Sequence, residues 1–167
     1  MRKIPLTRGY EALVSASDYD QVAHLKWSVV NCGGKLYARH YTGAIPRRVI
    51  FMHRLLTNAP KGMLVDHKNG NGLDNRRENI RLCTNSQNGM NQDSPKPNGY
   101  KGVTFDKSRG KSPWLARITK DGVMTYIGCF GTALEAAKAY DIAAKKVFGE
   151  FAKVNFRVRH LLTSKIA

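Results

Sequence analysis

The C-terminal half of the chain alternates apolar and polar residues over three short stretches. Residues 100–105, 114–120 and 124–130 follow this period of two and are rich in aromatic and β-branched side chains, which predicts three strands. Asp121-Gly122 lies between the second and third stretches and is a strong signal for a tight hairpin turn. We therefore predict a three-stranded antiparallel sheet in this half of the chain.

A helix is predicted directly after these strands. Thr132 is a good N-cap residue, Glu135 three residues later completes a capping box, and Gly149 is expected to end the helix. The expected apolar stripe consists of Leu134, Ala137, Tyr140 or Ile142, Ala144 and Val147. Such a helix covers one face of the sheet and leaves the other face, with its Arg, Thr, Lys and aromatic side chains, free for a DNA groove.

The N-terminal half has a less regular pattern, typical of an α+β fold. Its short apolar pieces lie at residues 12–14, 27–30, 36–38 and 49–56. Ser17 is expected to begin a short helix that runs through Leu25. Residues 49–56 are expected to form either a helix or a strand.

A strand, a loop and a second strand are predicted after these pieces. Residues 63–65 form a short apolar strand that ends directly in Asp66-His67. The Asn-Gly-Asn-Gly sequence at 69–72 must turn the chain. The second strand is expected at residues 80–83.

A helix that carries a candidate metal ligand is expected next. Thr84 and Gln87 make another capping box, which places Asn88 in the first helical turn. A phosphodiester repels nucleophiles, so a nuclease commonly uses a hard cation such as Mg²⁺, held by few protein oxygens. The carboxylate of Asp66 and the carboxamide oxygen of Asn88 can supply those oxygens.

His67 is expected to have a different role from Asp66, because neighbouring side chains of a strand point to opposite faces. With an ordinary pKa near ~6.5, its imidazole is largely neutral at pH 7 and can take a proton from water. A calcium-binding EF-hand is excluded, since Lys68 and Gly70 stand at ligand positions. Taken singly, these residues have simpler explanations, as turn residues, surface polarity or, for Asp74-Asn75, a helix cap.

Residues 92–99 separate the two halves. They contain two prolines and end in Asn-Gly, so neither a helix nor a central strand continues through them. We predict a domain at 1–91, a linker at 92–99, a second domain at 100–156 and a tail at 157–167. A chain of 167 residues gives each domain only a thin core.

The formal net charge is +16 at pH 7, and the excess of Lys and Arg is divided equally between the two halves. A nucleic acid duplex carries a phosphate charge about every 1.7 Å and is the natural partner of such a chain. Solubility and attraction to a membrane surface are the alternative explanations.

The cysteines and the hydropathy pattern indicate an intracellular protein. Cys32, Cys83 and Cys129 form no C-x-x-C motif, which argues against a disulfide framework and a zinc knuckle. A zinc site of Cys83, His67 and His53 would need ligands that the spacing does not offer. No apolar run approaches the ~20 residues that span a bilayer, and the N-terminus lacks a signal-peptide core.

A set of residues in the first domain carries a family resemblance. It consists of Met52-His53-Arg54-Leu55, Asp66-His67, Asn75-Arg76, Asn79 and Asn88, preceded by Asp18-Tyr19-Asp20, Lys26-Trp27 and Leu36-Tyr37-Ala38-Arg39. These residues resemble the HNH (His-Me finger) nucleases, particularly the homing-type branch in which the final His is replaced by Asn. The resemblance implies a ββα-metal core at about residues 53–91.

The same resemblance implies roles for individual side chains. Asp66 and Asn88 would bind Mg²⁺ or another divalent cation such as Mn²⁺, His67 would be catalytic, and Asn79 would hold the imidazole or brace the loop. Candidates for clamping phosphate are Arg76, Arg77 and Arg81, of which Arg76 is preferred for its motif position. His53 is expected to pack structurally, with a direct catalytic role as the alternative.

The second domain resembles the plant ethylene-response-factor DNA-binding domain of the AP-two type over residues 100–156. The resemblance rests on Tyr100-Lys101-Gly102-Val103, Trp114-Leu115-Ala116-Arg117-Ile118, Tyr126-Ile127-Gly128-Cys129-Phe130, Thr132, Ala136-Ala137, Ala139-Tyr140-Asp141, Ala143-Ala144, Phe148-Gly149 and Asn155-Phe156. In that family the sheet lies in the major groove. By position, the resemblance implies DNA contacts by Lys101, Thr104, Trp114, Arg117, Thr119 and Tyr126, and Lys107 and Arg109 are added as candidates.

Two departures from that family concern base preference. Thr104-Phe105-Asp106 stands where the family has an Arg-rich first strand, and Tyr126 replaces its usual Trp, so the base preference does not carry over. Packing of a small sheet is the alternative explanation for Trp114 and Tyr126. Arg117 is the preferred base contact because Arg pairs bidentately with guanine, whereas Lys101 and Lys107 would meet phosphate.

These patterns together predict a metal-dependent DNA endonuclease of the HNH homing type. It would hydrolyse phosphodiester bonds, as a nick or a double-strand cut, at sites bound by its C-terminal domain. Double-stranded DNA is the expected partner, the protein would act as a monomer or homodimer, and the expected location is the cytoplasm of a phage-infected or bacterial host cell. The alternatives are a sequence-specific DNA-binding regulator with an inactive nuclease domain and an RNA-binding or RNA-cleaving protein.

Overall fold

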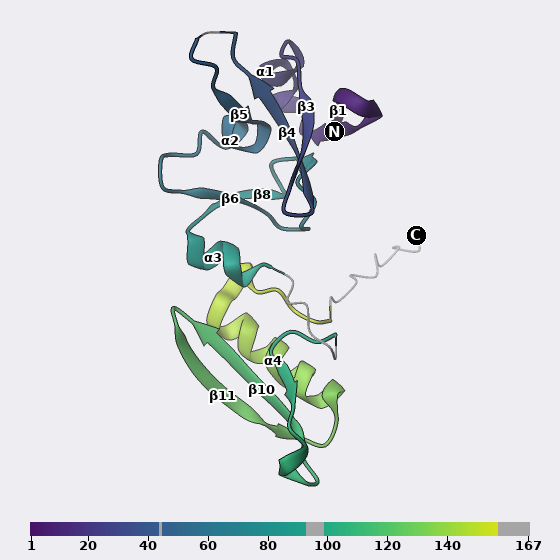
Figure 1. Ribbon diagram of the computed structural model, residues 1–167, viewed down its shortest axis with the longest axis vertical. Helices are drawn as coiled ribbons and strands as arrows, with labels where there is room; N and C mark the ends of the chain where they lie inside the picture. The colour runs from purple at the N-terminus through teal and green to yellow at the C-terminus, as the bar shows by residue number, and fades with distance from the viewer. Residues whose placement is uncertain (44, 93–98, 157–167) are drawn as a thin grey trace, which may run out of the picture. The chain divides into compact units, whose positions relative to one another are not determined.

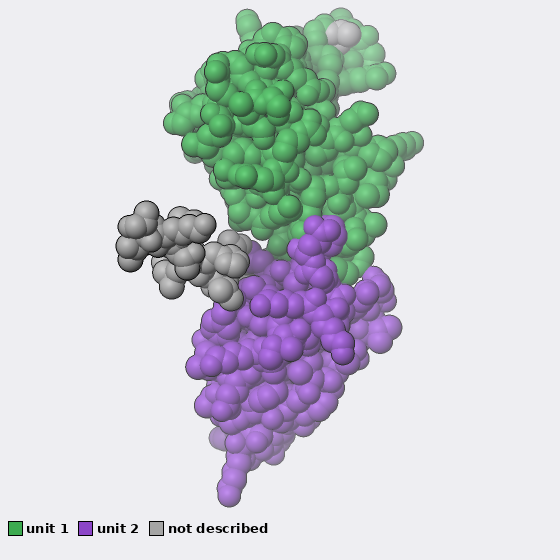
Figure 2. Space-filling view, turned by 180° about the vertical axis from the view of Figure 1, so that it is seen from behind, with its two compact units in different colours: residues 1–91 green, residues 92–167 purple. Residues whose placement is uncertain are grey.

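The computed structural model describes residues 1–43, 45–92 and 99–156. The chain divides into two compact units, Met1–Asn91 and Gln92–Ala167, which Figure 2 shows in different colours. Each unit has its own hydrophobic core. Most of the predicted linker, at 93–98, and the predicted tail, at 157–167, lie outside the described residues.

Small sheets and short helices build the described part of the N-terminal unit (Figure 1). The first sheet has the order β1 (Arg2–Pro5), β2 (Glu11–Val14) and β7 (Asp74–Asn75); the second has β3 (Ser28–Cys32), β4 (Lys35–Tyr41) and β5 (Val49–Phe51); the third pairs β6 (Leu64–His67) with β8 (Ile80–Cys83). The helices are α1 (Tyr19–Ala23), α2 (Met52–Thr57) and α3 (Asn85–Met90), with 3-10 turns at Thr7–Gly9 and Ala16–Asp18. The unit is therefore a mixed α and β structure.

The core of this unit follows from strand alternation. Ile4 from β1 and Ala12 and Val14 from β2 point inward and are fully buried. Val22 from α1 and Met52 from α2 pack into the same cluster. Burial of each large aliphatic side chain stabilises the fold by about 1.5–3 kcal/mol, so these few residues carry much of the stability of a small unit.

The predicted order of strand, loop, strand and helix is present after α2. β6 runs antiparallel to β8, with Asp66 opposite Arg81. α3 follows β8 directly, and its capping box is formed, because the Thr84 side chain accepts from Gln87 N and the Gln87 side chain accepts from Thr84 N. As expected, the first strand ends in Asp66-His67, since both residues lie at the end of β6.

Two other boundaries in this unit differ from the prediction. Residues 49–56 form both structures in turn, since β5 runs directly into α2. The short helix was expected from Ser17 to Leu25 but begins and ends two residues inside these bounds. A 3-10 turn comes first, and Asp18 takes the N-cap position without a side-chain cap.

The C-terminal unit has the predicted sheet and helix. β9 (Val103–Phe105), β10 (Trp114–Lys120) and β11 (Val123–Phe130) form an antiparallel sheet in the order β11-β10-β9, and α4 (Ala133–Phe148) packs on it (Figure 1). Asp121-Gly122 makes the hairpin turn, with both φ angles positive at 51° and 81°. Thr132 and Glu135 form the predicted capping box, and Gly149 ends α4 with a φ of 55°. A 3-10 turn at Lys107–Arg109 follows β9, and another at Gly149–Phe151 follows α4.

The predicted apolar stripe of α4 was wrong at two positions. Leu134 and Ile142 are 45% and 72% exposed and are not part of the buried face of α4. The buried face instead carries Ala136, Ala137, Tyr140, Asp141, Ala144 and Phe148. Small alanines let the helix approach the sheet closely, and a Cβ at Gly102 would lie only 2.0 Å from the ring of Tyr140, so glycine is required there.

A buried carboxylate fastens the end of the described chain to α4. Asp141 Oδ1 accepts from Asn155 N at 2.7 Å and from Asn155 Nδ2 at 3.0 Å, and Asp141 Oδ2 accepts from Phe156 N at 2.9 Å. Asn155 Oδ1 in turn accepts from Lys101 N at 2.7 Å. Asp141 thus holds residues 155–156 against α4, and Asn155 links them to Lys101 in the segment before β9.

Replacement of Asp141 should destabilise the C-terminal unit strongly. Asp141→Ala removes three hydrogen bonds to a charged group and leaves two part-buried backbone N–H groups without their acceptor, a loss of about 2–4 kcal/mol. Asp141→Asn keeps one oxygen acceptor and should lose less. Urea denaturation followed by circular dichroism measures both, and equal stability of Asp141→Ala and the wild type would contradict the assigned role.

Candidate active site

Asp66 lies on β6 with its carboxylate almost completely buried. Arg81, its partner on β8, donates to Asp66 Oδ2 from Nε at 2.9 Å and from Nη2 at 2.7 Å. Asn91, which ends α3, donates from Nδ2 to Asp66 Oδ1 at 2.8 Å and to the backbone oxygen of His67 at 3.1 Å. The two oxygens of Asp66 therefore face different elements, Oδ2 toward β8 and Oδ1 toward the end of α3.

His67 is the next residue of β6, and its side chain has a separate set of neighbours. Its Nε2 lies 3.3 Å from Oδ1 of Asn75, a residue with 0% exposure. A carboxamide oxygen only accepts, so this contact assigns the proton of the neutral ring to Nε2. Nδ1 then keeps its lone pair and is the nitrogen able to accept a proton.

The surroundings of His67 favour the neutral ring. Burial lowers the pKa of His67 below the ordinary histidine value, although the Asn75 contact and the charges of Asp66 and Asp74 act in the opposite direction. The imidazole is therefore in its basic form at neutral pH. This is the protonation state that a general base needs.

Aromatic rings hold the imidazole from the other side. The ring of His53 on α2 meets the imidazole edge to face, with 5.2 Å between the ring centroids. The ring of Tyr37 on β4 lies at a centroid distance of 5.8 Å. Phe51 stacks on His53 at 5.5 Å. Gly72 lies against Tyr37, where a Cβ would come within 2.6 Å of the ring, so the loop can approach only because this residue is glycine.

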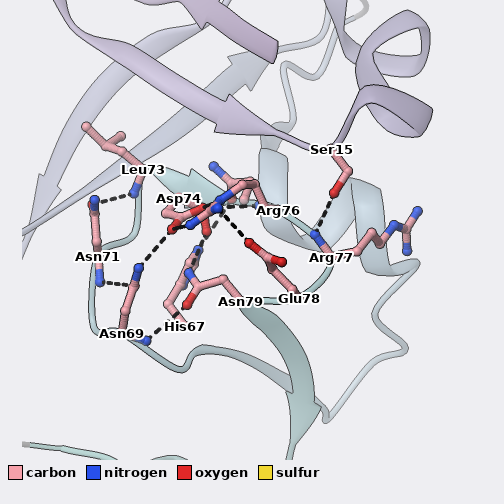
Figure 3. A network of polar contacts seen from close by, with 11 residues as sticks. Ser15, His67, Asn69, Asn71, Leu73, Asp74, Arg76, Arg77, Glu78 and Asn79 are labelled. Carbon is pink, nitrogen blue, oxygen red and sulfur yellow. Dashed lines mark hydrogen bonds and ion pairs between the residues drawn. The ribbon is translucent and has the colours of Figure 1, made fainter. Parts of the chain in front are cut away.

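The loop between β6 and β7 is braced by side-chain hydrogen bonds, which Figure 3 shows. Asn79 donates to the backbone oxygen of Asp74 at 2.7 Å and accepts from Asn69 N at 3.0 Å. Asn69 also donates to Asp74 Oδ2 at 2.8 Å. Of the two roles expected for Asn79, the structure shows these loop contacts, whereas Asn75 contacts the imidazole.

The arginines near this loop are held by carboxylates. Arg76 donates from Nε to Asp74 Oδ1 and from Nη2 to Asp74 Oδ2, both at 2.8 Å, and also pairs with Glu78. Arg77 pairs with Asp18 at 2.8 Å. Among the three arginines expected to clamp phosphate, Arg81 is the one whose carboxylate partner is the predicted metal ligand Asp66.

Asn88, the second predicted metal ligand, lies on α3 and lines a shallow cavity of about 280 Å³. The cavity is also lined by Cys32, Tyr37, Phe51, His53, Arg54, Leu64 and Val65. Asn91, three residues after Asn88, is the carboxamide that contacts Asp66. Asn88 thus shares a cavity with Leu64 and Val65 of β6, while Asn91, just after α3, contacts Asp66 itself.

The sequence prediction gave no role to Asn75 and did not include Asn91. Asn75 stood in the quoted motif beside Arg76, so its position was a usable signal. Asn91 had only its spacing of three residues from Asn88. The contact of Asn75 with His67 depends on the folded loop, and the contact of Asn91 with Asp66 depends on where α3 ends.

The open face of the C-terminal sheet carries an arginine held by its neighbours. Arg117 on β10 is exposed and donates from Nη2 to Thr104 Oγ1 at 3.3 Å and from Nη1 to Met124 Sδ at 3.8 Å. Nearby, the hydroxyl of Tyr126 and Nη1 of Arg109 both donate to Cys129 Sγ, at 3.0 and 3.3 Å. These contacts orient Arg117, Arg109 and Tyr126 on the exposed surface.

The other predicted DNA contacts differ in accessibility. Trp114 is half-buried, packs against the core below the sheet and meets the ring of Phe105 at 4.9 Å, which is the packing alternative. Lys101 donates from Nζ to the backbone oxygen of Gln92 at 2.7 Å. The predicted contacts that the structure leaves exposed are Lys107, Arg109, Arg117, Thr119 and Tyr126, while Thr104 is half-buried.

Known proteins match this chain in both units. A family model described as HNH endonuclease matches residues 57–90, the segment that holds Asp66, His67 and α3. Protein 3.8 of Escherichia phage T7 is 34% identical over 91 residues, which cover 53% of this chain and 72% of that protein. The chain belongs to the HNH endonuclease family.

Two further relatives extend the comparison. An uncharacterised HNH endonuclease of Acanthamoeba polyphaga mimivirus is 29% identical over 150 residues, which cover 89% of this chain and 76% of that protein. An AP2-like ethylene-responsive transcription factor of Arabidopsis thaliana is 44% identical over 61 residues, which cover 36% of this chain and 12% of that protein. The HNH chain thus also contains a region similar to AP2-type transcription factors, and both predicted resemblances are confirmed.

HNH nucleases commonly use a divalent cation, and the donors around Asp66 fit one of the hard type. The Asp66 carboxylate and the carboxamide of Asn88 on α3 can offer oxygen, which Mg²⁺ prefers. Among the described residues, no group of three His, Cys, Asp or Glu that could hold a metal ion is present. Burial raises the pKa of Cys83 to about 11, so this thiol is protonated at neutral pH. No helix in the described segments is both long and apolar enough to cross a bilayer.

Acid should destabilise the N-terminal unit through His53. Burial, with the neighbouring His67 and Arg54, lowers the pKa of His53 to about 3, and its buried Nδ1 has no hydrogen-bond partner among the described residues. Above pH ~6.5 the ring is neutral in both the folded and the unfolded chain, so it adds no pH dependence. Below that pH the unfolded chain takes up the proton first, and at pH 5 the loss reaches about 2 kcal/mol.

The variant His53→Phe keeps an aromatic ring beside Phe51 but cannot take up a proton. Its free energy of unfolding, measured by urea denaturation at pH 7 and pH 5, should fall less than that of the wild type. Replacement of the exposed His24 by Phe is the control and should leave the wild-type difference unchanged. An equal fall in His53→Phe and the wild type would contradict the assigned cause.

Proposed function

We propose that this HNH protein is a metal-dependent DNA endonuclease of the homing type, whose C-terminal unit binds the duplex. The observation that carries the proposal is the pair of neighbouring residues on β6. Asp66 offers a carboxylate toward the Asn91 amide at the end of α3, while His67 offers a neutral imidazole whose Nε2 is held by Asn75. A phosphodiesterase needs these two chemistries side by side.

In the proposed reaction, His67 acts as the general base. Nδ1 takes a proton from water, the water oxygen forms a bond to phosphorus, and the bond from phosphorus to the 3′ oxygen breaks. The 3′ oxygen takes a proton from solvent, so the products are a 5′-phosphate and a 3′-hydroxyl. Asn75 keeps the ring oriented, and Asp66 with Asn88 would hold a divalent cation, Mg²⁺ or Mn²⁺, which supplies Lewis-acid stabilisation of the negative charge on phosphate when bound.

Asn79 and Arg76 have supporting roles in this proposal. Asn79 fixes the loop that carries Asn75, through its bonds to Asp74 and Asn69. Arg76 would meet phosphate only after exchange of its contacts with Asp74, so its present role is to stiffen the same loop. One such site cuts one strand, and a double-strand cut requires a homodimer or two successive reactions by a monomer.

Double-stranded DNA is the proposed partner. The net charge of +16 favours a polyanion, and the exposure of Arg117 on β10 supports a contact with base edges. The relatives in phage T7 and mimivirus support action inside an infected cell, in the cytoplasm of a bacterial host in the phage case.

A DNA-binding regulator with an inactive nuclease unit is the second candidate function. The similarity to plant transcription factors favours it, since those proteins share the sheet and helix region. The presence of Asp66, His67 and Asn88 favours the enzyme. A cleavage assay separates the two.

The enzyme should nick supercoiled plasmid DNA with Mg²⁺ and should not do so with EDTA. His67→Ala should lower the rate by about 10²–10⁴-fold, because it removes the general base. His24→Ala, at an exposed histidine outside the site, is the matched control and should keep the wild-type rate. Nicking that survives EDTA, or equal rates for His67→Ala and the control, would refute the assignment.

Base readout by the C-terminal unit can be tested with two cationic side chains. Arg117→Ala should relax base preference at one position by about 1–3 kcal/mol of discrimination. Lys107→Ala should weaken binding to all duplexes alike and reduce the dependence of affinity on salt. Selection of bound duplexes from a random pool, followed by affinity measurements at several salt concentrations, compares the two variants. Equal effects of both variants on unrelated sequences would remove the readout claim.

A further inference from the structure

Every oxygen of the Asp66 carboxylate already has a hydrogen-bond donor. Arg81 places two nitrogens on Oδ2, at 2.9 and 2.7 Å, and Asn91 places Nδ2 on Oδ1 at 2.8 Å. The side chains of Arg81 and Asp66 are only 10% and 6% exposed, so solvent screens this ion pair weakly. The guanidinium of Arg81 therefore occupies the carboxylate of Asp66, the proposed metal ligand.

A divalent cation and a guanidinium compete for this one carboxylate. Both are positive, and the low exposure of the pair strengthens their mutual repulsion. The cost of the competition falls if Arg81 finds another anion close by. A DNA phosphate held at the site is such an anion, because a guanidinium binds phosphate bidentately as well as it binds carboxylate.

We propose that Arg81 is a phosphate-responsive latch on Asp66, which holds the carboxylate in the DNA-free protein and transfers to the DNA phosphate when substrate binds. This inference rests on the proposed function and adds a regulation of the same site. Transfer of Arg81 frees Asp66 for the cation. DNA binding and cation binding then favour each other, and by linkage each raises the affinity of the other by the same factor.

Arg81 differs in this respect from the two other arginines expected to clamp phosphate. Arg76 and Arg77 are paired with Asp74 of β7 and with Asp18 at the start of α1. Movement of either arginine would leave the Asp66 carboxylate paired with Arg81. Arg77 therefore serves as a matched control, with the same charge and a carboxylate partner outside the site.

The test measures Mn²⁺ binding to the full chain by titration calorimetry, with and without a duplex that the chain binds. His67→Ala is used as the background throughout, so that the duplex stays intact. In this background, the duplex should raise Mn²⁺ affinity by about tenfold, within the usual range of coupling between sites. Arg81→Gln should bind Mn²⁺ about tenfold more tightly without DNA, and added duplex should then have little further effect.

Arg77→Gln should keep both the weak DNA-free affinity and the coupling, which shows that loss of one positive charge from the unit is not the cause. Arg81→Lys retains a cation without the bidentate fork and should give an intermediate coupling. Circular dichroism identifies variants that fail to fold. If Arg81→Gln fails to fold, the effect of DNA on the Mn²⁺ affinity of the His67→Ala protein still tests the proposal. Unchanged or weaker Mn²⁺ binding by folded Arg81→Gln, or no effect of DNA on affinity, would overturn the latch.

The outcome is distinguishable from failure of the proposed function. A protein that nicks DNA with Mg²⁺ but has independent Mn²⁺ and DNA affinities keeps its nuclease assignment and loses the latch. A protein that binds Mn²⁺ and DNA in a coupled manner but cuts no DNA keeps the latch and loses the nuclease assignment.

Discussion

The antiparallel pairing of β6 with β8 is the constraint on which the candidate active site depends. Because Asp66 stands opposite Arg81, its carboxylate is held on one face of the strand pair. Side chains alternate along a strand, so the imidazole of His67 points to the opposite face and contacts Asn75. A shift of the register by one residue would exchange the two faces and send the imidazole away from Asn75. Two residues adjacent in sequence thus obtain two environments, one charged and paired, the other neutral and enclosed by aromatic rings.

The site keeps polar atoms that a small core would otherwise exclude. His53 Nδ1 and Asn75 Nδ2 are buried, and neither has a hydrogen-bond partner in the described structure. Each such atom lowers stability by about 1–3 kcal/mol. The unit retains them because Asn75 must present its oxygen to His67, and because the neutral ring of His53 packs edge to face on the same imidazole. Both unpaired atoms thus belong to residues that fix the position and the protonation state of the His67 side chain.

Local signals predicted the elements well, while contacts between distant residues were less accessible. β8, both capping boxes and the Asp121-Gly122 turn depend on neighbours within a few residues, and all are present. The stripe of α4 failed at Ile142, because a helical period admits more than one apolar face and only the packed sheet selects between them. Likewise, only the folded loop shows that Asn75 reaches the imidazole while Asn79 braces the turn. The roles of Asp66, His67, Asn88 and the DNA contacts remain predictions.

The proposed division of labour follows from what each set of side chains can recognise. In the N-terminal unit, the groups at the site address water, a cation and phosphate, which are the same at every nucleotide, so they supply no base preference. A chain of net charge +16 would then bind any duplex through counterion release. Selectivity needs a side chain that is both exposed and held, since a free arginine loses conformational entropy on binding. Arg117 meets this requirement through its contacts with Thr104 and Met124, which support its assignment to base edges over phosphate.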